Sequence, residues 1–89
     1  MPQDRPPGFA AEILPLFRPQ DIDCMRQVAV YLDDPAWMTD PAGDLRRPDH
    51  AHARRVFATL QSGRMPPDAP WSERQLALYA AWMAAGFAP

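Results

Sequence analysis

The sequence has one cysteine, Cys24, and no lysine. A single cysteine cannot form an internal disulfide, which excludes the disulfide frameworks that stabilise many small secreted domains. The nine basic residues are all arginine, and eleven acidic residues bring the net charge to −2. A nucleic-acid-binding domain usually has a net basic face, so we predict no nucleic-acid partner.

Long apolar runs are also missing. No segment approaches the ~20 apolar residues that a helix needs to cross a bilayer. Residues 1–8 contain neither an apolar run of signal-peptide length nor a cleavage-site pattern. We therefore predict a cytoplasmic protein that has no membrane partner.

Motifs of known enzyme classes are absent as well. The sequence has no phosphate-binding loop, nucleophile elbow or nucleotide-binding fingerprint. No pair of carboxylates shows a reason for the split pKa values that acid–base catalysis uses. These absences predict that the protein is not an enzyme.

The residues that are present suffice for one small helical domain. Hydrophobic residues make up 47% of the 89 positions, and three Trp, four Phe and two Tyr supply large apolar side chains. No segment shows the alternating, β-branched pattern of a strand. We therefore predict an all-α fold, a compact bundle of about four short helices. Residues 1–8 hold three prolines and a glycine and are expected to form a flexible arm before a single domain over residues 9–89.

The first two helices are expected over residues 9–17 and 19–31, where apolar residues recur at helical spacing. Pro15 should end or kink the first helix, because proline disfavours a helical conformation in the residue before it. Pro19 suits the start of the second helix, because proline is favoured in the first helical turn. Residues 33–47 contain several turn signals and are predicted to form a loop.

The third helix is expected to begin at Pro48, and Gly63 is expected to cap its end, because glycine readily adopts the left-handed conformation found there. Ser72 and Gln75 have the spacing of a capping box. They predict a last helix over residues 73–85.

Three motifs occur in order along the chain. Residues 13–17 read Ile-Leu-Pro-Leu-Phe, residues 60–67 read Leu-Gln-Ser-Gly-Arg-Met-Pro-Pro, and residues 71–86 begin with Trp-Ser and end with Trp-Met-x-x-Gly. Together these motifs resemble a class I cytochrome c domain, and the resemblance spans residues 9–87. It implies a cytochrome c-like fold, in which the methionine before the prolines, Met65 here, stands at the position of an axial haem ligand.

The residues that attach haem covalently in that family are missing. This chain has Asp21, Cys24 and Met25 where the Cys-x-x-Cys-His motif has its two cysteines and its histidine. The resemblance therefore implies a haemless subfamily, in which side chains fill the haem space or an apolar ligand pocket remains. The large side chains that are candidates for filling it are Trp37, Met38, Phe57, Trp71, Trp82 and Met83.

These observations predict a non-catalytic accessory module that interacts with a protein partner, an enzyme. Its binding face is expected to include Met65, Pro66, Pro67 and Met25, where a cytochrome presents its haem edge. Acidic residues dominate the first half of the chain and arginines the second. Such an asymmetric charge distribution can orient a docking partner. This function requires no cofactor.

The alternative is a non-covalent haem- or copper-binding redox protein. Met65 would be one ligand, and Cys24, Met25, His50 or His52 would be the other. The two histidines are two positions apart, so their side chains point to different sides of a helix and do not form the i, i+4 clamp of helical zinc sites. They are expected to be a surface pair, and Cys24 is expected to be buried and inert. A third hypothesis makes the chain a substrate for modification at Cys24, a tryptophan or a tyrosine.

Overall fold

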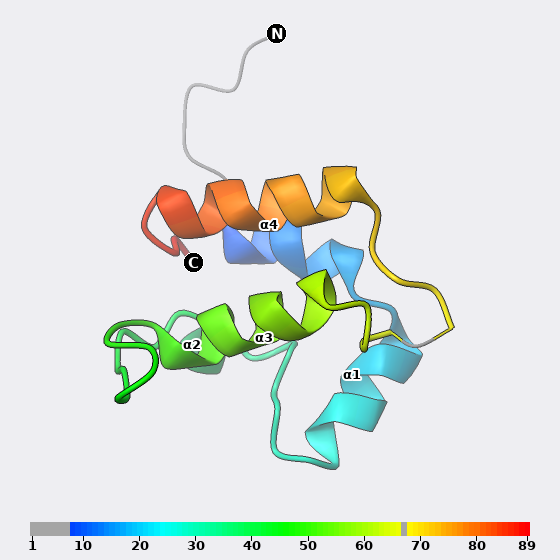
Figure 1. Ribbon diagram of the computed structural model, residues 1–89, viewed down its shortest axis with the longest axis horizontal. Coiled ribbons are helices and arrows are strands. Elements are labelled where there is room, and N and C mark those ends of the chain that lie inside the picture. Colours follow the sequence, from blue (N-terminus) through cyan, green and yellow to red (C-terminus); the bar gives the residue numbers. More distant parts are fainter. Residues whose placement is uncertain (1–7, 67) are drawn as a thin grey trace, which may run out of the picture.

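The structure, a computed structural model, describes residues 8–66 and 68–89 of the chain. Helical segments follow one another in the order η1, η2, α1, α2, α3 and α4 (Figure 1). The described residues contain no β-strand, so the prediction of an all-α fold is confirmed. The predicted N-terminal arm lies outside the described residues except for Gly8.

The first helical segment is divided in two at the proline that was expected to interrupt it. η1 (Phe9–Ile13) is one turn of π-helix, and η2 (Leu14–Leu16) is one turn of 3₁₀-helix that contains Pro15. Phe17 is already extended. η1 is held against the other end of the chain, because the backbone amides of Phe9 and Ala10 donate to the carbonyls of Ala88 and Pro89.

The second helix is shorter than predicted. α1 (Pro19–Arg26) begins at the expected proline but ends well before Tyr31, so the predicted helix over residues 19–31 is wrong in its last third. Ala29 has a φ of 62°, in the left-handed region that the interior of a right-handed helix cannot contain. The chain turns sharply at Ala29 and runs back toward the core.

The segment predicted as a loop contains a short helix, so that prediction is wrong for four residues. α2 (Pro35–Met38) begins after Asp34, whose carboxylate accepts hydrogen bonds from the backbone amides of Ala36 and Trp37. Aspartate followed by proline is a helix-start signal as well as a turn signal. The buried side chain of Met38 anchors this helix to the core.

α3 (Ala51–Gln61) and α4 (Glu73–Ala84) are the two longest helices. α3 begins three residues after Pro48, because His50 has a φ of 47° and interrupts the expected first turn. Gly63, with a φ of 79°, follows its end as predicted. The capping box at Ser72 is confirmed, with both reciprocal hydrogen bonds formed.

The core lies between η1, α3 and α4, which contribute Phe9, Val56 and Trp82 to it. In Figure 1, α4 lies above α3 and α1 lies at one edge of the molecule. α3 and η1 both contact α4, and both contact α2. Of the large side chains expected to fill the centre, Met38, Trp71 and Trp82 are buried, whereas Trp37, Phe57 and Met83 are half-buried around it. The interior next to α4 is therefore filled by side chains.

Candidate functional site

One pocket opens between α3 and the segment that follows α1, and its volume is about 290 Å³. The wall from α3 consists of His52, Arg55, Val56 and Thr59. Their spacing is i, i+3, i+4 and i+7, which places all four on one face of the helix. The polar groups on this wall are the Arg55 guanidinium, the Thr59 hydroxyl and one edge of the His52 imidazole, and the rest of its surface is apolar.

The opposite wall is formed by the end of α1 and the turn after it. Met25, Val28, Ala29 and Val30 line the pocket there. The left-handed conformation of Ala29 reverses the chain between the two valines, so both approach the same opening. Val28 is 64% exposed and adds apolar surface to the rim of the pocket.

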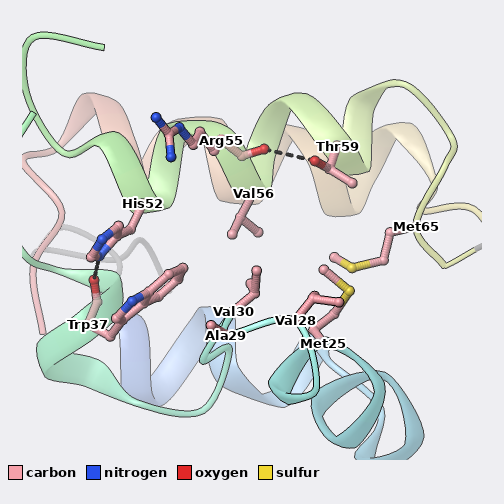
Figure 2. Close-up of a pocket in the computed structure, with 10 residues that line it drawn as sticks. All are labelled: Met25, Val28, Ala29, Val30, Trp37, His52, Arg55, Val56, Thr59 and Met65. Atoms are coloured by element: carbon pink, nitrogen blue, oxygen red, sulfur yellow. Dashed lines mark hydrogen bonds between the residues drawn. The ribbon is translucent and has the colours of Figure 1, made fainter. Parts of the chain in front are cut away.

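The two ends of the pocket have different chemistry (Figure 2). At one end the imidazole of His52 stacks on the indole of Trp37, with ring centroids 4.0 Å apart and planes 9° from parallel. At the other end lie the two thioethers of Met25 and Met65. Met65 is 6% exposed, so it packs into the core and still lines the pocket.

The proton position on His52 follows from its hydrogen bond. Nδ1 lies 2.9 Å from the backbone carbonyl oxygen of Trp37. A carbonyl oxygen can only accept, so Nδ1 carries a proton and donates. In the neutral ring the lone pair is then on Nε2, the nitrogen that can bind a metal or accept a hydrogen bond.

Arg55 is the cationic group at the pocket rim. It forms an ion pair with Asp44, and its side chain is 61% exposed. The hydroxyl of Thr59 donates to the backbone carbonyl of Arg55 at 3.0 Å. The two residues lie one turn apart on the same face of α3 and form a ridge along it. The pocket therefore has an apolar interior, two sulfur atoms at one end and a positive charge on the rim.

The structure brings together two of the four residues predicted to bind a partner. Met25 and Met65 line the same pocket from different segments of the chain. Pro66 is fully buried and lines a separate hollow with Arg18 and Trp71, whereas Pro67 lies outside the described residues. The shared surface is thus the pocket rather than the edge of the Met-Pro-Pro segment.

Two expectations about the chemistry-bearing side chains need correction. Cys24 is exposed on α1 and does not line the pocket, so the prediction of a buried cysteine is wrong. The histidines do point to different sides, but neither is a freely exposed surface residue. His52 stacks on Trp37, and His50 stacks on Phe87 with ring centroids 3.7 Å apart.

Sequence reasoning missed the contribution of α3 to this site. Arg55 and Thr59 were not expected to share a pocket with Met65, and His52 was named beside Met65 only in the alternative of a haem or copper site, although their helical spacing with Val56 was visible in the sequence. Among the described residues, no group of three or more His, Cys, Asp or Glu side chains has a metal-binding arrangement. No helix in residues 8–66 and 68–89 is long and apolar enough to span a bilayer.

Comparison of the chain with known protein families, with curated proteins and with solved structures finds no match. The function must therefore be argued from the pocket and its surroundings.

Proposed function

We propose that this protein is a non-catalytic accessory module that binds a partner protein, an enzyme, through the pocket between α1 and α3. The observation that carries the proposal is an open, largely apolar pocket whose rim includes an exposed valine. An uncovered apolar pocket of this kind is a common anchor site in protein interfaces. The partner would cover Val28 and the adjoining turn.

A haemless cytochrome c-like fold is part of the same proposal. The sequence motifs support it, and so does a helical arrangement in which Met65 borders a pocket facing α1. On this view, the buried side chains of Trp71 and Trp82 fill part of the space that haem fills in cytochromes, and a pocket of about 290 Å³ occupies another part. That pocket serves partner binding rather than electron transfer.

Photo-crosslinking in the native cells tests the accessory function. We expect benzoylphenylalanine introduced at Val28 to crosslink to one enzyme, whose activity changes when the purified protein is added. The matched control is the same substitution at Ala81, an exposed position on α4 that does not line the pocket. Equal crosslinking from both positions, or none from Val28, would contradict the proposal. A charge at the same place, Val28→Glu, should weaken the complex, whereas Ala81→Glu should not.

A second candidate function is copper binding, which is favoured by the two thioethers at one end of the pocket. Met25 and Met65 supply the soft sulfur donors that suit Cu(I), whereas His52 lies at the other end of the pocket. Cys24 and His50, the other predicted ligands, lie elsewhere. Haem fits less well, because about 290 Å³ is at the lower limit of the ~300–1,000 Å³ typical of small-molecule sites and a macrocycle needs more room.

Cu(I) titration against a chromophoric chelator distinguishes the two candidates. Met25→Leu and Met65→Leu keep the volume of the side chain but remove the sulfur, and hydrophobic exchanges of similar volume cost less than about 1.5 kcal/mol in stability. If the pocket is a copper site, either variant should lose stoichiometric Cu(I) binding. If the protein is an accessory module, both variants should still bind the partner. A wild-type protein that takes no Cu(I) from the chelator would exclude the copper function.

A further inference from the structure

A second hollow adjoins the pocket across α3. Arg46, Arg47 and Arg55 line it together with Ala58 and Thr59, and its volume is about 280 Å³. We call it the arginine hollow. Arg55 and Thr59 belong to both, so their ridge is the shared wall between the pocket and the arginine hollow. An occupant of the pocket that extends over this ridge comes directly onto the arginines.

The arginine hollow carries an excess of positive charge on an acidic chain. Residues 44–55 contain four arginines and two aspartates, an excess of +2 (4 − 2), whereas the whole chain has a net charge of −2. The two aspartates are already engaged, Asp44 with Arg55 and Asp49 with Arg54. Within residues 8–66 and 68–89, no carboxylate forms an ion pair with Arg46 or Arg47. The Arg47 guanidinium donates to the backbone carbonyl of Arg46, and both guanidinium groups keep further N–H donors for an acid from outside.

The pocket itself favours an aromatic group. Met25 and Met65 place two polarisable sulfur atoms at one end, and thioethers contact aromatic rings favourably. The Trp37–His52 stack lines the other end, where a bound ring can contact the aromatic side chains, and Arg55 on the rim can approach the face of that ring. A volume of about 290 Å³ accommodates one large side chain and excludes a packed helix.

We propose that the pocket and the arginine hollow form one docking surface for an acidic segment of the partner protein, which inserts a single aromatic side chain into the pocket. Carboxylates next to that side chain cross the Arg55–Thr59 ridge and pair with Arg46 and Arg47. The aromatic side chain supplies most of the affinity, as central anchors do in interfaces. The carboxylates set the orientation and make association sensitive to salt. The proposal rests on the accessory function and specifies the chemistry of its partner.

The test uses a peptide as a stand-in for the partner segment. Acetyl-Glu-Trp-Glu-Glu-amide is titrated into the full-length protein and followed by NMR through the methionine methyl signals and backbone amides. We expect shifts at Met25, Met65 and Arg46. Replacing tryptophan by alanine in the peptide should weaken binding at least about tenfold, and replacing the glutamates by glutamine should remove its salt dependence.

Matched arginine variants locate the acidic contact on the protein. Arg46→Gln should weaken binding of the glutamate peptide about two- to fivefold, the effect of one exposed ion pair. Arg74→Gln makes the same charge change at an exposed position of α4 and should leave the affinity for the peptide unchanged. Neither arginine is needed for the fold, since both side chains are exposed.

Other outcomes would overturn the proposal. These are shifts confined to residues outside the pocket and the arginine hollow, no shift at all, equal binding of the glutamine peptide, or free indole-3-propionate binding as tightly as the peptide, which would indicate a small-molecule site. The accessory function would survive any of these results if Val28 still crosslinks to an enzyme. It would fail separately if that crosslink is absent, even when the peptide binds as expected.

Discussion

Tyr79 is a fully buried side chain whose one polar atom has a defined partner. Its hydroxyl donates to the backbone carbonyl of Ala53 at 2.8 Å and so ties α4 to the first turn of α3. Burial raises the pKa of this hydroxyl above its ordinary value. Because the folded pKa lies above the unfolded one, the associated stability is complete below about pH 10 and is lost as the pH rises further.

Removing that hydroxyl gives a prediction at the residue scale. Tyr79→Phe keeps the ring and deletes the donor, so the free energy of unfolding should fall by about 0.5–1.5 kcal/mol, as measured by urea denaturation. The additional loss of stability above about pH 10 should shrink in the same variant. Tyr31→Phe is the control, since Tyr31 is exposed, and its stability should equal that of the wild type. Equal losses in both variants would show that the Tyr79 hydrogen bond contributes nothing.

At the element scale, α4 depends on its capping box. The backbone N–H of Gln75 donates to the Ser72 hydroxyl at 3.2 Å, and the backbone N–H of Ser72 donates to the side-chain oxygen of Gln75 at 2.9 Å. These bonds satisfy two amides that would otherwise lack partners at the start of the helix. α4 forms one side of the core, so its first turn matters for the whole domain.

Ser72→Ala is therefore expected to lower the free energy of unfolding by about 1 kcal/mol. The loss should appear as a lower urea midpoint with an unchanged denaturant slope. Ser72→Asp is the informative control, because aspartate also caps helices and should retain most of the stability. If Ser72→Asp loses as much free energy of unfolding as Ser72→Ala, Ser72 stabilises the protein through something other than the helix cap.

At the scale of the whole molecule, ion pairs connect distant parts of the chain. Arg18, at the start of α1, donates to Asp21 and also reaches Asp68 beyond α3, 50 positions away, at 2.8 Å. Hydrogen bonding from Arg18 holds the pKa of Asp68 below its ordinary value. Hydrogen bonding from the Arg54 guanidinium, with a smaller contribution from His50, lowers the pKa of Asp49 in the same way.

These lowered pKa values predict the acid response of the fold. A carboxyl whose folded pKa is depressed contributes stability above its unfolded pKa, near 3.8, and loses it as the pH falls toward the folded value. The melting temperature should therefore be level near pH 6 and decline below about pH 4. Asp68→Asn should make that decline shallower, whereas Asp23→Asn should not, because Asp23 lies 3.9 Å from its partner Arg26 and Asp68 lies 2.8 Å from Arg18. Identical acid profiles for both variants would contradict this account.

The candidate site was predictable from the sequence only in part. The pairing of Met25 with Met65 was proposed from the cytochrome c resemblance, and the structure places both in one pocket. The exposure of Cys24 was not foreseen, because a free cysteine is more often buried and its rotation on a short helix depends on where that helix docks. The arginine hollow was equally invisible, since it depends on how residues 44–47 fold back onto α3.

The sequence by itself determined the features that depend on local interactions. The all-α class, the start of α1 at Pro19, the capping box at Ser72 and the glycine after α3 all follow from groups a few residues apart. Only the tertiary structure decided the end of α1 and the late start of α3. Ala29 and His50 adopt left-handed conformations that their residue types disfavour, and packing against the rest of the domain must hold them there. The turn at Ala29, which no local pattern specifies, lines the pocket between α1 and α3.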